Sequence, residues 1–410
     1  MQLKRAKALL ISLSILLTFF FSNNFGLIDV EKTSIITAIA IDKEQDEYIL
    51  TAQVAVPEAT DTNTENQKAQ LSSKGKTVGE ALKEMGDVSG WFPKLAFCNL
   101  IILGNSLANE NVVNLLDYFA KTLRLQDSAL VALSEKTAKE LLSLSTPLDN
   151  ISSFAIQKIL LKASQFDNDV APTDIKTFVS GYYSKNKSGY MPLIKVISAD
   201  NGSGSEGQKS DNSSTNGGGS GASSSGDQKG QGANSQSNNL FDARTTALFK
   251  EGKFVGELSP TETLVFNAFS EKINGTSIAI KNVPLNGKEC NYLLNIMTDS
   301  HSLKVKAKDN GIDLEFNLSL FCKVSDVFTT NAEDSLSSNT PLPKPLIEKT
   351  ERLLTENIIS LVNKSISSGC DLLKIKEKLY RYNHSKYSQY KDNFLSKLNL
   401  KINVDVRGQR

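Results

Sequence analysis

The feature that most constrains this chain is a long stretch that cannot contribute to a hydrophobic core. Gly, Ser, Asn and Gln dominate from Asn201 to Asn239, and Ala222 and Ala233 are its only apolar side chains. Such a composition buries too little surface to offset the conformational entropy lost on ordering. We therefore predict a disordered tether at residues 200–239, which separates an N-terminal domain (29–199) from a C-terminal domain (240–410).

An uncharged apolar run, residues 8–21 (ALLISLSILLTFFF), follows the basic stretch at 4–7. This order is typical of a segment that directs a chain to a membrane. As a helix the run would span ~21 Å, which suits a signal peptide, whereas extension to Ile28 would give ~31 Å, enough to cross a bilayer. Residues 1–28 are thus a signal peptide or an uncleaved membrane anchor. The lack of a small-x-small cleavage pattern favours the anchor, and we expect the rest of the chain outside the cytoplasm.

The N-terminal domain alternates apolar strand patterns with helical patterns. Two alternating runs flank the acidic turn Lys43–Glu47 and predict a hairpin. The capping box Thr77–Glu80 predicts the start of a helix. The order of elements indicates a mixed sheet covered by helices. We expect strands at 34–42, 48–56, 99–103, 128–133 and 190–198. We also expect one helix that starts at 77, one over 112–123, one that ends at 142, one over 153–163 and one over 173–179, with Thr173 as the cap of the last.

The C-terminal domain has equally clear signals for helix starts and turns. Ser259–Glu262 combines a capping box with Pro at the first helical position, and Asn310-Gly311 is a strong hairpin signal. A long amphipathic helix is predicted at 346–366, and the alternation over 398–406 predicts an edge or closing strand of an antiparallel sheet. Both halves therefore predict an α+β fold of two or three subdomains, with mixed or antiparallel sheets flanked by helices, behind an N-terminal membrane segment. Further strands are expected at 244–249, 253–258, 303–307 and 312–324, and a further helix around Leu372, Ile375 and Leu379.

Composition excludes several classes of protein. The chain has 46 Lys and Arg against 45 Asp and Glu, with no long basic run after the apolar segment, so it lacks the charge pattern of a nucleic-acid binder. Its four cysteines are too few and too scattered for a disulfide framework or a zinc site. Cys322 lies in an alternating run and is predicted to be a small core side chain.

Motifs for catalysis are also lacking in the sequence. The two histidines, His301 and His384, have no neighbour pattern of a metal ligand or a catalytic triad, and no P-loop or nucleophile elbow occurs. We expect no enzymatic activity, no cofactor and no metal. Trp91 and Phe92 form one apolar loop, for which insertion into the core and contact with a partner are both open.

The order and spacing of several segments resemble the Ger(x)C spore germination proteins, the C subunits of nutrient germinant receptors. The resemblance covers nearly the whole chain outside the tether. Each segment is weak alone, and their order and spacing together make the resemblance specific. The segments are 29–42 (DVEKTSIITAIAID), 48–57 (YILTAQVAVP), 75–82 (GKTVGEAL), 97–104 (FCNLIILG), 246–258 (TALFKEGKFVGEL), 371–382 (DLLKIKEKLYRY) and 402–408 (INVDVRG).

One position departs from the family pattern. Family members carry a lipid-accepting Cys in a Gly-Cys-Trp-Asp context at the end of the apolar segment, whereas this chain has Leu27 there, between Gly26 and Ile28. Leu27 has no thiol to acylate, so no lipidation site is expected. Retention at the membrane would then depend on the uncleaved segment or on partners.

The resemblance implies a non-enzymatic subunit at the outer face of the spore inner membrane. It would assemble with polytopic A- and B-type receptor subunits, and small-molecule germinants would act only through the complex. As candidate partner contacts we single out Asp29, Asp42, Trp91 and Phe92, together with the helix at 346–366. The alternative function is an exported solute-binding protein or one that acts on the cell wall.

Overall fold

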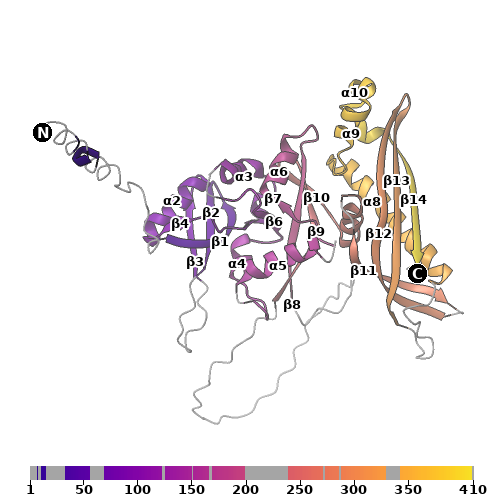
Figure 1. The fold of residues 1–410 in the computed structure, drawn as a ribbon, viewed down its shortest axis with the longest axis horizontal. Coiled ribbons are helices and arrows are strands. Elements are labelled where there is room, and N and C mark those ends of the chain that lie inside the picture. The colour runs from indigo at the N-terminus through magenta and orange to yellow at the C-terminus, as the bar shows by residue number, and fades with distance from the viewer. Residues whose placement is uncertain are drawn as a thin grey trace, which may run out of the picture.

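The computed structural model shows two β-sheets lying side by side, joined through helices (Figure 1). The first is a ten-stranded mixed sheet and the second a four-stranded sheet. The structure describes residues 7, 11–14, 33–55, 69–121, 125–149, 151–165, 169–198, 239–270, 273–285, 288–328 and 342–408.

The first sheet contains strands from both sides of the predicted tether. Its strands are β1 (Thr33–Glu44), β2 (Glu47–Ala55), β3 (Ala69–Gly75), β4 (Phe92–Lys94), β5 (Leu100–Leu103), β6 (Leu130–Ser134), β7 (Thr173–Asp174), β8 (Ser188–Ser198), β9 (Asn239–Lys250) and β10 (Lys253–Leu258). The order is β10-β9-β8-β6-β5-β1-β2-β3, with β4 beside β1 and β7 beside β6. The predicted hairpin is confirmed, because β1 pairs antiparallel with β2 across a tight turn.

Helices cover both faces of this sheet. One face carries α2 (Val78–Ser89), α3 (Val112–Lys121) and α6 (Ile175–Tyr183), whose buried side chains form one core cluster with Ile39 and Ile41 of β1. The other face carries α4 (Ala138–Ser143) and α5 (Ser152–Gln165), whose buried side chains form a second core cluster with Ala38 and Ala40. A sheet buried on both faces needs continuous apolar runs, and all four residues of β5 are accordingly buried.

The strands that precede and follow residues 199–238 belong to the same sheet. Strand β9 pairs antiparallel with β8 from Ser188↔Lys250 to Ser198↔Asn239, and β10 pairs with β9. The boundary predicted at 200–239 therefore falls between two paired strands of the first sheet, whereas the two sheets divide between β10 and β11, at α7 (Pro260–Ser270), whose apolar side chains belong to the core of the second sheet. The physical reason is that β8 would otherwise expose its unpaired backbone N–H and C=O groups along an edge.

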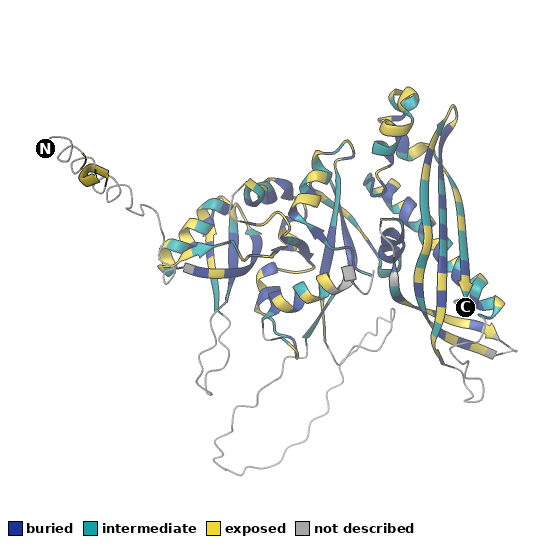
Figure 2. Cartoon of the chain, in the orientation of Figure 1, coloured by how far each residue is buried: buried dark blue, intermediate teal, exposed yellow. Residues whose placement is uncertain are grey.

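The second sheet is covered on one face. It consists of β11 (Asn274–Leu285), β12 (Lys288–Lys308), β13 (Gly311–Phe328) and β14 (Leu398–Gly408) in this order. Leu354, Ile358 and Leu361 of α8 (Lys344–Ser368) lie in one core cluster with the inward side chains of these strands. Along β13 buried residues alternate with more exposed ones, and along β14 half-buried residues alternate with exposed ones (Figure 2), so no described element covers the other face. Two shorter helices, α9 (Ile375–Tyr382) and α10 (His384–Tyr390), follow α8.

Two details of the prediction are wrong. Strand β14 is an edge strand, as expected, but it pairs parallel with β13, because the chain returns through α8, α9 and α10 before entering the sheet. Thr173 does not cap a helix, since it lies in β7. Asp174 caps α6 instead, and its Oδ1 accepts a hydrogen bond from the Thr177 amide at 2.6 Å.

The predicted N-terminal membrane segment and most of the tether prediction lie outside the described residues. Only residues 7 and 11–14 of the segment 1–28 are described, and these are helical. Among the helices that the structure describes, none combines the length and the apolar character needed to cross a membrane.

Candidate functional site

Two of the highlighted positions, Asp29 and Leu27, lie outside the described residues, whereas Asp42 is clearly placed. Asp42 is buried at the end of β1, and its carboxylate accepts hydrogen bonds from the amides of Ala138 (2.8 Å) and Lys139 (2.9 Å) at the start of α4. Burial raises the pKa of this carboxyl, and the two amide hydrogen bonds oppose that rise. Gly104 leaves the necessary space, because a Cβ there would lie 1.8 Å from Asp42 Oδ1. This inward position argues against a partner contact through Asp42.

Trp91 and Phe92 lie at the surface, with 48% and 38% of their area exposed, so insertion of both rings into the core is excluded. Contact with a partner stays a prediction. The loop is well defined: α2 ends at Gly90, which adopts φ 72°, and the Trp91 amide donates to Ser89 Oγ at 3.2 Å. Pro93 then lies against α2, because a Cβ on Gly86 would be 3.3 Å from Pro93 Cδ.

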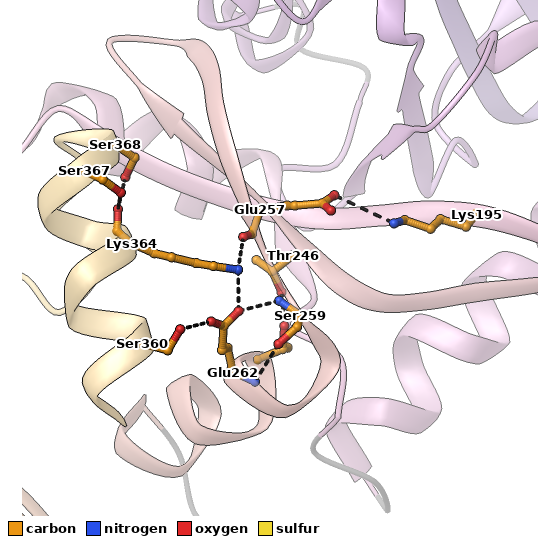
Figure 3. Close-up of polar contacts among 10 residues, drawn as sticks. Lys195, Thr246, Glu257, Ser259, Glu262, Ser360, Lys364, Ser367 and Ser368 are labelled. Atoms are coloured by element: carbon orange, nitrogen blue, oxygen red, sulfur yellow. Dashed lines mark hydrogen bonds and ion pairs between the residues drawn. The ribbon is translucent and has the colours of Figure 1, made fainter. Parts of the chain in front are cut away.

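A polar cluster joins the two sheets, and sequence analysis did not find it. Its centre is Glu262 of α7, which is almost fully buried (Figure 3). Lys364 of α8 donates to Glu262 Oε2 at 2.6 Å and to the Glu257 carbonyl of β10 at 2.9 Å. Ser360, one turn earlier in α8, donates to Glu262 Oε1 at 2.5 Å. Both oxygens of one buried carboxylate are therefore held by the helix that covers the second sheet.

The electrostatics of Glu262 follow from these contacts. Burial opposes ionisation of the carboxyl, but hydrogen bonds from Lys364, Ser360 and Ser259 outweigh it, so the pKa of Glu262 is lowered. The Ser259 amide donates to Glu262 Oε2 at 2.7 Å, which confirms the predicted capping box. The sequence signal identified Glu262 as a cap. The only sequence signal for the contact between Glu262 and α8 was the spacing of Ser360 and Lys364, which lie four residues apart on one helix face.

A second connection lies after α8. Cys370 Sγ approaches the Phe249 carbonyl of β9 at 3.3 Å, and the Asp371 amide donates to Ser188 Oγ of β8 at 3.0 Å. The buried Asp371 carboxylate accepts hydrogen bonds from the Ile375 and Lys376 amides, both at 2.8 Å, at the start of α9. Burial raises the pKa of Asp371, and these amide bonds oppose the rise. The loop between α8 and α9 is thus fixed to the first sheet.

The four cysteines of the chain lie in the hydrophobic cores of the described residues. All four cysteines are buried free thiols, and Cys322 belongs to the core of the second sheet, as predicted. Burial raises the pKa of Cys322 to about 12, which keeps its thiol protonated. His384 is exposed at the start of α10, whereas His301 is half-buried in β12. Within the described part of the chain, no three His, Cys, Asp or Glu side chains are grouped so that they could hold a metal ion.

Comparison with known families assigns both halves of the chain. The model described as "Spore germination protein N-terminal domain" matches residues 27–196. The model described as "Spore germination B3/ GerAC like, C-terminal" matches residues 244–409. The chain belongs to the GerAC-like family of spore germination proteins. The resemblance to the Ger(x)C family, the C subunits of germinant receptors, is thereby confirmed, and the family indicates a spore-associated protein.

The GerAC-like fold is also seen in a solved structure. "Crystal Structure of the GerBC protein" matches with a TM-score of 0.50 and 16% sequence identity, over 91% of this chain and 97% of that one. At this identity the match supports the fold, and it confirms the predicted α+β class. No curated protein shows significant sequence similarity to the chain.

Proposed function

We propose that this GerAC-like chain is a non-enzymatic, membrane-associated subunit of a spore nutrient germinant receptor. It couples germinant sensing to the start of germination through contacts with polytopic A- and B-type subunits. The observation that carries this proposal is that the two family models together match both domains, residues 27–196 and 244–409. An exported solute-binding or cell-wall-acting protein is the competing assignment, and no contact among the described residues favours it.

The two connections between the sheets support a coupling role. Glu262 with Lys364, and Asp371 with Ser188, tie α8 and its following loop to the first sheet. Because the two sheets are connected in this way, a partner that binds one sheet can also affect the position of the other. Coupling of this kind requires that partners or germinants bind the alternative states of the assembled receptor with different affinity.

The proposed location is the outer face of the spore inner membrane. Because Leu27 occupies the position of the family's lipid-accepting Cys, attachment relies on residues 1–28 or on the polytopic subunits. Of the single residues named as candidate contacts, Trp91 and Phe92 are exposed, and the helix at 346–366 also keeps one exposed side.

Affinity capture tests the proposal. The tagged full-length chain is purified from membranes of dormant spores in mild detergent, beside an untagged strain as control. We expect recovery of polytopic A- and B-type receptor subunits in the tagged sample alone. Their repeated absence would contradict the receptor assignment. Calorimetric titration of the isolated full-length chain with amino acids and sugars should show no heat of binding, and a clear binding curve would favour the solute-binding alternative.

A further inference from the structure

We propose that an exposed apolar patch beside the start of β1 docks onto the lipid bilayer surface that holds the N-terminal segment. The Trp91 patch consists of Ile35, Val88, Trp91 and Phe92. This inference rests on the membrane association of the proposed function, and it adds a lipid-contact site within the folded part of the chain.

The patch is built where three elements, α2, β4 and β1, meet at one corner of the first sheet. Val88, at the end of α2, is 76% exposed, and Trp91 and Phe92 follow within four residues. Strand β4 pairs parallel with the start of β1, with Thr33 opposite Phe92 and Ile35 opposite Lys94. Register partners and alternate residues of paired strands share a face, so Ile35, itself 41% exposed, and Phe92 point to the same side.

The patch lies close to the N-terminal membrane segment along the chain, and this position identifies the lipid bilayer as the surface that it contacts. Thr33 lies 12 residues after Phe21, the last residue of the apolar run, and such a linker reaches at most about 40 Å. Thr33 is also the residue paired with Phe92. The Trp91 patch is therefore the part of the described fold next to the chain's connection to the membrane segment, at the end of the molecule where α2 and β4 lie (Figure 1). The second sheet lies at the opposite end.

The chemistry of the patch suits the boundary between lipid headgroups and acyl chains. Trp combines a large apolar ring with an N–H donor, and aromatic residues concentrate at membrane interfaces for this reason. Exposed Phe and Val side chains add apolar area, which favours shallow insertion. Lys94, on the same short strand, carries a positive charge that complements anionic headgroups.

The loop is also held in place before docking. Gly90 in the left-handed conformation, the hydrogen bond from the Trp91 amide to Ser89, and the packing of Pro93 at Gly86 fix the backbone on both sides of the rings. A surface that is already ordered loses less conformational entropy when it binds.

Trp91 is the only tryptophan of the chain, so its fluorescence reports on the patch alone. The full-length chain is reconstituted with vesicles of phosphatidylcholine and phosphatidylglycerol, with and without bromine on the acyl chains, and vesicle-bound protein is isolated by flotation. We expect Trp91 emission to shift to shorter wavelength, to be quenched by the brominated lipids and to be protected from aqueous iodide.

Each outcome decides the inference. If the chain floats with the vesicles but Trp91 is quenched by iodide and unaffected by bromine, the patch faces water or a protein partner, and the inference is overturned while membrane attachment stands. If the chain does not float, both the patch and the anchor are overturned. Capture of the polytopic subunits is a separate measurement, so a failed receptor assignment remains distinguishable from a failed patch.

Variants separate docking by the patch from attachment by the N-terminal segment. Val88→Ser combined with Phe92→Ser keeps the Trp91 probe and should abolish quenching by brominated lipids, while flotation persists. Phe328→Ser is the matched control, because Phe328 is also strongly exposed but lies at the end of β13 in the second sheet. Lipid quenching should be unchanged in this control. Equal quenching in the double variant and the unmodified chain would contradict the proposal.

Discussion

The two sheets of this molecule bury their residues in different ways. In the first sheet both faces are covered, so neighbouring residues of one strand, such as Ile101 and Ile102, belong to different cores and are both fully buried. In the second sheet only the face toward α8 is covered, so Leu320 is fully buried while the next residue, Phe321, is exposed. The difference shows why one half of the sequence has continuous apolar runs and the other has strict alternation.

The difference also determines where partners can bind. Among the described residues, helices cover both faces of the first sheet, and the Trp91 patch is one of the places where its part of the chain exposes apolar side chains. The second sheet offers a broad open face with charged register partners, among them Lys304 opposite Glu315 and Glu315 opposite Lys401. The proposed lipid-contact patch and this open face therefore lie at opposite ends of the molecule (Figure 1).

The largest expected effects test this comparison directly. Ile101→Ala and Ile102→Ala should each lower the free energy of unfolding by about 2–5 kcal/mol, because each removes buried methyl groups from one of the two cores. In the second sheet, Leu320→Ala should cost a similar amount, whereas Phe321→Ala should cost about 1 kcal/mol or less. Urea denaturation of the full-length chain, followed by circular dichroism, measures all four.

The pair Leu320 and Phe321 is the sharper half of this test, since the two residues are adjacent in β13. Equal destabilisation at both positions would mean that the outer face of the second sheet is covered in solution, which would remove the contrast between the sheets. A small effect at either Ile101 or Ile102 would mean that one face of the first sheet is not a packed core.

A smaller loss is expected when α4, which is also capped by Thr137, loses the acceptor for its first two amides. Asp42→Ala leaves the amides of Ala138 and Lys139 without their acceptor in a buried site, which should cost about 2–3 kcal/mol. Asp42→Asn keeps one acceptor oxygen and should cost less. The control is Asp46→Ala, in the exposed turn after β1, which should have little effect on the urea midpoint. An Asp42→Ala protein as stable as this control would show that α4 does not depend on the cap.

Local signals in the sequence were sufficient for most elements. The capping boxes at Thr77 and Ser259, the turn at Gly311 and the apolar run of β5 each specify their structure through contacts within a few residues. Pairing between distant strands left no such signal. Neither the parallel pairing of β14 with β13 nor the return of β9 to β8 could be derived from alternation, because period-two patterns fix which face is buried and not which strand is adjacent.

The candidate site shows the same limit. The exposed Trp91 loop was singled out from its composition, whereas Asp42 was chosen for a resemblance and proved to be an internal cap. The contact between Glu262 and Lys364 joins residues 102 positions apart, and only the folded arrangement of α7 and α8 brings them together.

The smallest expected effect concerns the connection between the two sheets. Lys364→Met removes the cation that pairs with the buried Glu262 carboxylate, and should lower the free energy of unfolding by about 1–2 kcal/mol. The value is moderate because 37% of the Lys364 side chain is exposed and solvent screens the pair. Arg352→Met is the matched control in the same helix, where more than half of each side chain of the ion pair with Glu356 is exposed and its loss should not be measurable.

The pH dependence identifies the source of this effect. The pKa of Glu262 is lowered in the folded state, so its contribution is present above the ordinary value of 4.5 and is lost as the pH falls through the folded value. The stability difference between the unmodified chain and Lys364→Met should therefore shrink as Glu262 becomes protonated. A difference that is constant from neutral to acidic pH would show that Lys364 acts through packing of its aliphatic chain, and that the sheets are held together without this ion pair.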